Sequence, residues 1–246
     1  MKCLILAAGY ATRLYPLTEN FPKPLLEVGG KPILNWLIED IETTGKVNEY
    51  IVVTNHKFAH FFEKWANELS YNITVVDDGT ESNETRLGAV KDIDYAIKKL
   101  HIEDELIVIA GDNLLDFSMN KFVRYFREKL SSCVMRYYEE DEKRLKKSGV
   151  IEIDENDRII GMEEKPENPK SHWCCPPFYF LIRHDVELIE KAIEFGCSTD
   201  APGSYIAWLS KRTEVNAMEM PGKRYDIGNI ESYNDVQREY KGIVNE

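Results

Sequence analysis

Short apolar runs alternate with amphipathic stretches through the first 110 residues, and this alternation constrains the fold more than any other feature. The runs hold few polar side chains, as strands covered on both faces require. Strands that are joined by helices pair in parallel, so the sequence predicts an α/β fold with a mostly parallel sheet and helices on both faces. Predicted strands span residues 3–7, 50–54, 73–76 and 106–110, and predicted helices span residues 32–44, 58–69 and 87–100.

The second half of the chain has a different pattern, with strand signals that follow one another directly. A turn at residues 155–157 separates two short extended runs and predicts a hairpin. No repeat and no long linker interrupts the chain, so we predict one domain, residues 1–246, whose second half adds antiparallel strands. Further strands are predicted at 149–153, 159–162, 178–182 and 215–218, and helices at 186–195, 205–209 and 230–240.

The charge balance limits the partners of the chain. Its 246 residues include 31 basic and 43 acidic side chains, a net charge of −12. Phosphates would be repelled, so we expect no general binding to nucleic acid or to a membrane surface. No apolar run approaches the roughly 20 residues that span a bilayer, and Gly9 interrupts the N-terminal run too early for a signal peptide. We therefore expect a cytoplasmic protein, and its five cysteines, which form no CxxC pair, are expected to be reduced thiols.

The loop after the first strand has the composition of a phosphate-binding segment. Its small residues would let backbone amides approach phosphate oxygens. Arg13 adds a planar cation, and Lys23, between two prolines, adds a compact one. Neither the P-loop spacing nor GxGxxG is present, so a tight turn with solvated cations is the alternative. The predicted nucleotide-binding residues of this loop are Leu6, Ala7, Ala8, Gly9, Arg13 and Lys23.

A second polar segment follows the predicted strand at residues 106–110. Ligands of open parallel sheets bind beyond the carboxyl ends of the strands, so we expect functional residues just after Ala7 and just after Ala110. Asp112 stands at the second of these places. Its carboxylate suits Mg²⁺, which is held by one or two carboxylates together with substrate phosphates. A helix cap is the alternative role for Asp112.

The order of these motifs resembles a known family. The run from Leu6 to Thr18, LAAGYATRLYPLT, followed by PKPLL at 22–26, resembles the signature of sugar-1-phosphate nucleotidyltransferases of the short, glucose-1-phosphate thymidylyltransferase-like form. The resemblance continues at GDN (111–113), EEKP (163–166) and YDIG (225–228). It implies a Rossmann-like nucleotide-diphospho-sugar transferase fold. Ala11 departs from the pattern, because the family usually has a second glycine there.

The resemblance also implies roles for individual residues. Mg²⁺ would be the cofactor, held by Asp112 and Asp226; a turn role is the alternative for Asp226. The implied catalytic residues are Arg13, Lys23, Asp112 and Lys165. Asp78, Gly79 and Gly88 join the nucleotide-binding set, and Asn113, Gly149, Glu164, Lys165 and Tyr179 form the substrate-binding set. Solvated or turn-forming roles are the alternatives for Lys165, Gly149, Asp78 and Gly79. The CCPP run at 174–177 stands where relatives have a Ser/Thr-Gly pair beside the sugar, so we expect an altered acceptor pocket.

The implied reaction joins a nucleoside triphosphate and a sugar-1-phosphate into an NDP-sugar and pyrophosphate. Charge neutralisation and positioning would dominate such a transfer between two anions. The sequence leaves open the nucleobase, the sugar and homo-oligomer formation. Three alternatives remain, which are a cytidylyltransferase for phosphocholine-like or phosphonate acceptors, a non-catalytic nucleotide sensor, and a nicotinamide-dependent dehydrogenase, although the dehydrogenase glycine fingerprint is missing.

Overall fold

The computed structural model describes residues 1–244, and the chain divides into two compact units. Unit 1 holds residues 1–86, residues 110–121 and the C-terminal segment from Pro221. Unit 2 holds residues 87–109 and 122–220. The single domain expected from the sequence stays a prediction.

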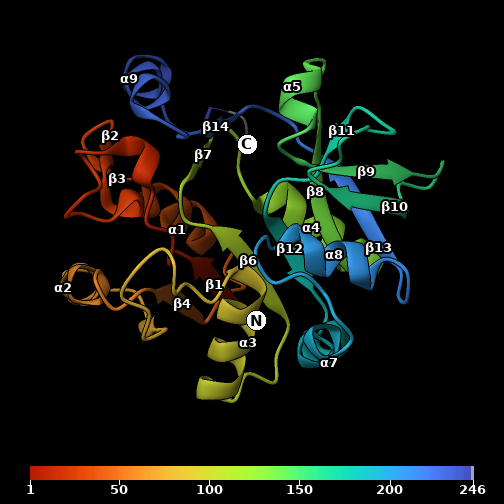
Figure 1. Cartoon of the computed structure of the whole chain (residues 1–246), viewed down its shortest axis with the longest axis horizontal. Helices are drawn as coiled ribbons and strands as arrows, with labels where there is room; N and C mark the ends of the chain where they lie inside the picture. Colours follow the sequence, from red (N-terminus) through yellow and green to blue (C-terminus); the bar gives the residue numbers. More distant parts are fainter. Residues whose placement is uncertain (245–246) are drawn as a thin grey trace. The chain divides into compact units, whose positions relative to one another are not determined.

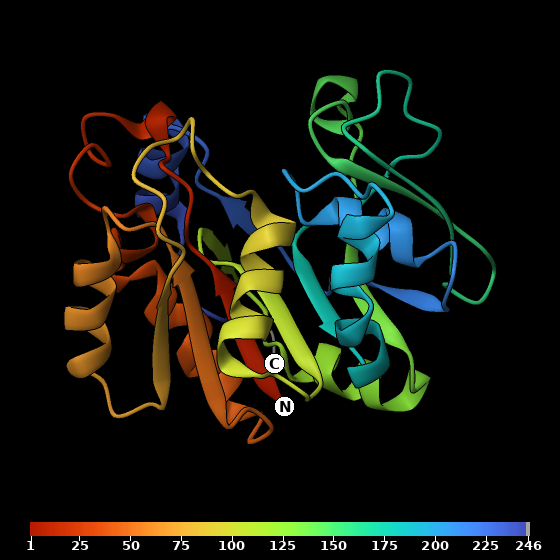
Figure 2. The same cartoon turned by 60° about the horizontal axis from the view of Figure 1, so that its bottom comes forward.

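The sheet of unit 1 consists of parallel strands joined by helices, as the apolar pattern predicted. The strands β1 (Lys2–Leu6), β4 (Glu49–Thr54) and β5 (Ile73–Asp77) lie in that order and pair in parallel (Figure 2). Helices α1 (Ile33–Thr43) and α2 (Ala59–Asn67) connect them. Both connections step across the sheet in the same direction, so right-handed crossovers place both helices on one face.

Short elements complete unit 1 and bring distant segments together. The 3₁₀ turns η1 (Thr12–Leu14) and η2 (Lys23–Leu25) follow β1. The pairs β2 (Glu27–Val28) with β3 (Lys31–Pro32) and β7 (Asn113–Leu115) with β14 (Arg224–Asp226) are antiparallel. Helix α9 (Ile230–Glu239) lies near β2 and β3 in Figure 1, and the Tyr233 hydroxyl donates to the Glu27 carbonyl at 2.8 Å. The C-terminal segment is thereby fixed to the N-terminal region.

Unit 2 contains most of the antiparallel strands. Strand β12 (Phe178–Leu181) pairs antiparallel with β6 (Leu106–Ala110) and with β8 (Ser132–Tyr138). The hairpin of β9 (Gly149–Ile153) and β10 (Ile159–Glu164) joins β8 through β11 (Trp173–Cys174). Strand β13 (Val215–Glu219) runs parallel to β8. The predicted antiparallel additions are confirmed.

The helices of unit 2 differ from the sequence prediction in one place. The predicted helix at 186–195 is two short helices, α6 (Arg183–Glu187) and α7 (Ile189–Glu194), which meet at Leu188. The segment after β7, for which the sequence gave no prediction, contains a helix. The remaining helices are α3 (Ala89–Leu100), α4 (Asn120–Lys129), α5 (Glu142–Leu145) and α8 (Gly203–Leu209). Within residues 1–244, none of these helices has the length and apolarity that a membrane span requires.

Candidate active site

The loop after β1 is held open by contacts from three neighbouring segments of unit 1. The Ala7 amide donates to the Val53 carbonyl at 2.8 Å, and the Asn55 side chain donates to the Ala8 carbonyl at 3.0 Å. The Tyr10 hydroxyl donates to the Thr80 carbonyl at 3.1 Å. The loop therefore lies against the segment that contains Asp78 and Gly79, so two parts of the predicted nucleotide site lie together.

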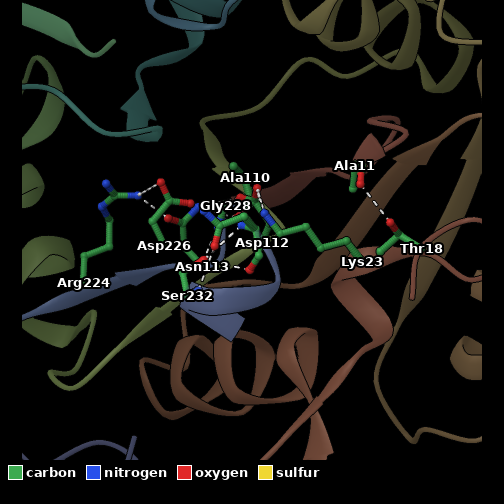
Figure 3. A network of polar contacts seen from close by, with 11 residues as sticks. Ala11, Thr18, Lys23, Ala110, Asp112, Asn113, Arg224, Asp226, Gly228 and Ser232 are labelled. Atoms are coloured by element: carbon green, nitrogen blue, oxygen red, sulfur yellow. Dashed lines mark hydrogen bonds and ion pairs between the residues drawn. The ribbon is translucent and has the colours of Figure 1, made fainter. Parts of the chain in front are cut away.

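Ala11 occupies the backbone conformation for which the family uses glycine. Its φ of 46° and ψ of 41° are left-handed, where a Cβ atom costs energy. The buried Thr18 hydroxyl donates to the Ala11 carbonyl at 2.8 Å, and Figure 3 shows this clamp. The path of the loop is therefore compatible with alanine, but it retains local strain.

The two predicted functional edges meet through the main chain. The Gly111 amide donates to the Leu6 carbonyl at 3.0 Å, and a Cβ on Gly111 would lie 3.0 Å from the Ile5 side chain. The glycine thus lets the segment before Asp112 pass close to β1. A cavity of about 170 Å³ lies here, and it is lined by Leu6, Ala7, Gly9, Ala11, Arg13, Leu14, Lys23, Pro24, Ala110, Asp112 and Gly228.

The strongest polar contact of this cavity joins Lys23 and Asp112. The Lys23 ammonium lies 2.7 Å from the Asp112 carboxylate, and the lysine side chain is only 9% exposed (Figure 3). Burial disfavours the charged carboxylate, but the charge and hydrogen bond of Lys23, together with Arg224, outweigh it and hold the pKa of Asp112 below its usual value. The pair therefore stays ionised at neutral pH. Arg13 also lines the cavity and is exposed.

Asp226 reaches the same region through the β14–β7 pair. Its register partner is Asn113, the residue after Asp112. The Arg224 guanidinium lies 3.8 Å from the Asp226 carboxylate and also donates to the Asn113 side chain. Asn113 in turn donates to Asp112 at 2.7 Å. The two carboxylates implied by the resemblance are therefore brought to one network, which Figure 3 shows.

The donor set of this network fits Mg²⁺. The side chains of Asp112 and Asp226 are 36% and 54% exposed, so both can be reached. Within residues 1–244 there is no group of three or more His, Cys, Asp or Glu side chains that could hold a metal alone. Two carboxylates without a third acidic ligand suit an ion that completes its coordination with water and substrate phosphates.

Unit 2 holds the other predicted substrate residues around the end of β10. Glu164 is mostly buried, and burial raises the pKa of its carboxyl. A Cβ on Gly149 would lie 3.0 Å from its Oε2 atom, which explains the glycine there. Tyr179 is buried on β12, and burial together with the charges of Cys175 and Glu164 raises its pKa. These side chains thus form one neighbourhood.

Lys165 follows β10 in a strained conformation. Its φ is +49°, and its amide donates to the Ser148 carbonyl at 3.0 Å. Its ammonium lies 3.9 Å from the Asp200 carboxylate, and its side chain is 52% exposed. A long side chain held out from a fixed backbone can reach an anionic ligand.

Gly88 makes a close contact inside unit 2. Its φ is +92°, and a Cβ would lie 2.5 Å from the Thr199 carbonyl oxygen. The first amides of α3, from Ala89 and Val90, donate to the carbonyls of Asp200 and Thr199. The glycine is therefore required by packing, and its predicted contact with the nucleotide stays a prediction.

Some residues of the site were missed from the sequence. Asn55, Tyr10 and Thr18 shape the loop, and Arg224 bridges Asn113 and Asp226. Arg224 stands next to the YDIG motif, which was the one available signal. The other three make single contacts with distant carbonyls, which no local pattern reveals.

The comparisons with known proteins agree with this geometry. The family model for nucleotidyl transferase matches residues 2–242. The chain is 30% identical, over 93% of its length, to the bifunctional protein GlmU of Methanocaldococcus jannaschii, and it spans about half (51%) of the length of that relative. It is 26% identical to the UTP–glucose-1-phosphate uridylyltransferase AglF of Haloferax volcanii, covering 97% of this chain and 96% of AglF. A structure of UDP-glucose pyrophosphorylase complexed with UDP-glucose superposes with a TM-score of 0.83 at 23% identity, covering 97% of each chain, which shows a shared fold. The chain belongs to the nucleotidyl transferase family.

Proposed function

We propose that this protein transfers a nucleotidyl group from a nucleoside triphosphate to a sugar-1-phosphate and releases pyrophosphate. The observation that carries the proposal is the buried Lys23 ammonium, paired with Asp112 in a cavity whose other wall is a loop of small residues. Membership of the family supports it, as does AglF, whose name gives UTP and glucose-1-phosphate as substrates.

The triphosphate is bound by the N-terminal loop and its two cations. Backbone amides near Gly9 approach phosphate oxygens, and Arg13 contributes a planar cation from the cavity wall. Lys23 holds its charge in a fixed position, so little reorganisation is needed when negative charge builds up on the departing pyrophosphate. Thr18 and Asn55 keep the loop in place through the Ala11 and Ala8 carbonyls.

Asp112 and Asp226 would hold Mg²⁺. When bound, the ion would neutralise phosphate charge and polarise the phosphorus–oxygen bonds. Arg224 orients Asp226, and Asn113 orients Asp112, because each lies within hydrogen-bond or ion-pair distance of its carboxylate.

The acceptor is assigned to residues of unit 2. Lys165 binds the phosphate of the acceptor, and Glu164 binds its hydroxyl groups. A phosphate oxygen of the acceptor attacks the α-phosphorus, and the bond to pyrophosphate breaks. This oxygen is already ionised near neutral pH, so no general base is required.

A matrix of nucleoside triphosphates, dTTP included, against sugar-1-phosphates and phosphocholine tests the function. We expect pyrophosphate with at least one sugar-1-phosphate, loss of the signal with EDTA, and its return with Mg²⁺. Pyrophosphate only with phosphocholine would replace the sugar acceptor with a non-sugar one. Triphosphate binding without any turnover would favour a nucleotide sensor.

A further inference from the structure

A second cavity, which we name the α8 pocket, lies within unit 2. Its volume is about 370 Å³, in the range of sites for small molecules. Hydroxyl, indole and cationic groups bound it together with one carboxyl group. Its polar and aromatic lining consists of Glu164, Ser198, Ser204, Trp208, Lys211 and Arg212.

One face of α8 forms the wall of the α8 pocket. Ser204, Trp208 and Lys211 follow one another at spacings of four and three residues, so they share a helical face. Gly203 begins the helix directly beside Glu164, and a Cβ there would lie 2.3 Å from the Glu164 Oε2 atom. Because no side chain separates them, the α8 pocket extends to the carboxyl group that we assign to the acceptor.

The cations of the α8 pocket are not neutralised by the protein. Across residues 1–244, neither Lys211 nor Arg212 forms an ion pair with a carboxylate. The Arg212 guanidinium lies 3.8 Å from the centre of the Trp208 ring and donates to the Trp208 carbonyl at 2.9 Å. The arginine is therefore held in place while its charge remains available.

The Trp208 indole adds a polar group without a partner. Its N–H is buried and has no hydrogen bond to any other residue that the structure describes. Buried donors are normally satisfied, so an unpaired one beside a cavity indicates an acceptor atom that is supplied from outside the protein. The chain as a whole carries a charge of −12. Two uncompensated cations and a free donor in such a protein favour an anionic ligand.

We propose that the α8 pocket binds a second acidic group, a carboxylate or a phosphate, on the acceptor. The acceptor is then a hydroxylated sugar phosphate with an additional negative charge. Glu164, Ser198 and Ser204 bind its hydroxyl groups, and Lys211 and Arg212 bind the second acid. The inference rests on the proposed function, because Glu164 belongs to both the acceptor site and the α8 pocket.

A matched pair of acceptors tests this inference. Glucose-1-phosphate and glucuronic acid 1-phosphate differ in a carboxylate at carbon 6, and glucose 1,6-bisphosphate carries a phosphate there. We expect kcat/KM, measured by pyrophosphate release, to favour the acidic acceptors about tenfold, as one charge-assisted contact would provide. The double variant Lys211→Gln/Arg212→Gln should lower that preference about tenfold. The control Lys99→Gln/Arg124→Gln removes the same charge from α3 and α4 and should keep the preference.

Cys197 provides a binding measurement that needs no turnover. It also lines the α8 pocket, and it is the one cysteine that is not buried, since Cys3, Cys133, Cys174 and Cys175 are. Alkylation of Cys197 should be slower with glucuronic acid 1-phosphate than with the same concentration of glucose-1-phosphate. The double variant should lose this difference.

The outcomes separate the inference from the proposed function. Turnover of both acceptors at the same rate, unchanged in the double variant, and equal alkylation would overturn the inference and leave the function standing. Selective protection of Cys197 without pyrophosphate from any acceptor would support the α8 pocket and reject the function. If glucuronate alone changes turnover of glucose-1-phosphate without competing with it, the acid binds as a separate effector, and the acceptor assignment is wrong.

Discussion

Asp112 in unit 1 and Glu164 in unit 2 are two carboxyl groups whose surroundings have opposite effects. Burial disfavours the charge on both. At Asp112 the Lys23 ammonium at 2.7 Å outweighs burial and lowers the pKa. Glu164 has no hydrogen bond or ion pair within the described chain, so burial prevails over the charge of Lys165 and raises the pKa. Direct contact with a cation, rather than depth of burial, decides the protonation of the two acids.

This difference matches the partners that we assign to the two sites. A carboxylate that stays ionised beside cations suits a metal ion and phosphate groups. A carboxyl group that is protonated more easily can donate as well as accept, which suits the hydroxyl groups of a sugar. Each prediction below changes one side of this comparison.

The largest effect is expected from Lys23→Ala. Loss of a fixed cation at the developing charge should lower kcat by roughly 10²–10³-fold, as the loss of comparable donors does. Lys165→Ala should act mainly through KM for the acceptor. Pyrophosphate release measures both, and the exposed Lys46→Ala is the control in unit 1. Turnover of Lys23→Ala within twofold of the unaltered protein would reject the role of Lys23.

Gly88 and Gly79 separate packing from backbone conformation. Both have positive φ, but a Cβ on Gly88 meets the Thr199 carbonyl at 2.5 Å, whereas nothing lies within 4 Å of one on Gly79. Gly88→Ala should cost roughly 3 kcal/mol, because strain and overpacking add, and Gly79→Ala about 1 kcal/mol. Urea denaturation measures both. Equal costs would mean that the contact of Gly88 with Thr199 contributes nothing to stability.

The two carboxyl groups should give opposite pH dependences of stability. The lowered pKa of Asp112 adds stability above its usual value of 3.8, and this contribution is lost as the pH falls through the lower folded value. The raised pKa of Glu164 removes stability as the pH rises above 4.5. Asp112→Asn should therefore weaken the fold at pH 7 more than at acid pH. Glu164→Gln should gain stability relative to the unaltered protein as the pH rises.

Denaturation curves between pH 3 and pH 8 test this pair. The variants are compared with the unaltered protein at each pH, so the other titrating groups cancel. Parallel pH profiles for Asp112→Asn and Glu164→Gln would show that the two carboxyl groups do not differ as described.

The smallest effect is expected at the strained backbone positions, one in each unit. Ala11 has φ 46° and Lys165 has φ 49°. Ala11→Gly and Lys165→Gly should each relieve strain and stabilise by about 1 kcal/mol, reduced by the greater freedom of glycine in the unfolded chain. Thermal denaturation measures the gain. Only Lys165→Gly should weaken acceptor binding, because only there is a functional side chain lost; destabilisation by Ala11→Gly would show that the loop gains from alanine.

Local patterns were sufficient for much of the fold. Continuous apolar runs predicted the parallel strands of unit 1, because a strand buried on both faces has nowhere to place polar side chains. The same runs predicted that the segments after Ala7 and Ala110 would be functional, and the contact between Gly111 and Leu6 confirms that they meet. The two helices α6 and α7 were predicted as one, because both continue the same apolar period.

The sequence by itself determined the alternation of strands and helices, and its motifs named the charged residues that carry the proposed chemistry. Only the tertiary structure decided which of them pair. The short strand β14, with the sequence RYD, has no apolar period, yet its register with β7 brings Asp226 opposite Asn113. The opposite pKa shifts of Asp112 and Glu164 likewise depend on neighbours far along the chain. Electrostatic energies follow distances in space, and local sequence patterns contain no such distances.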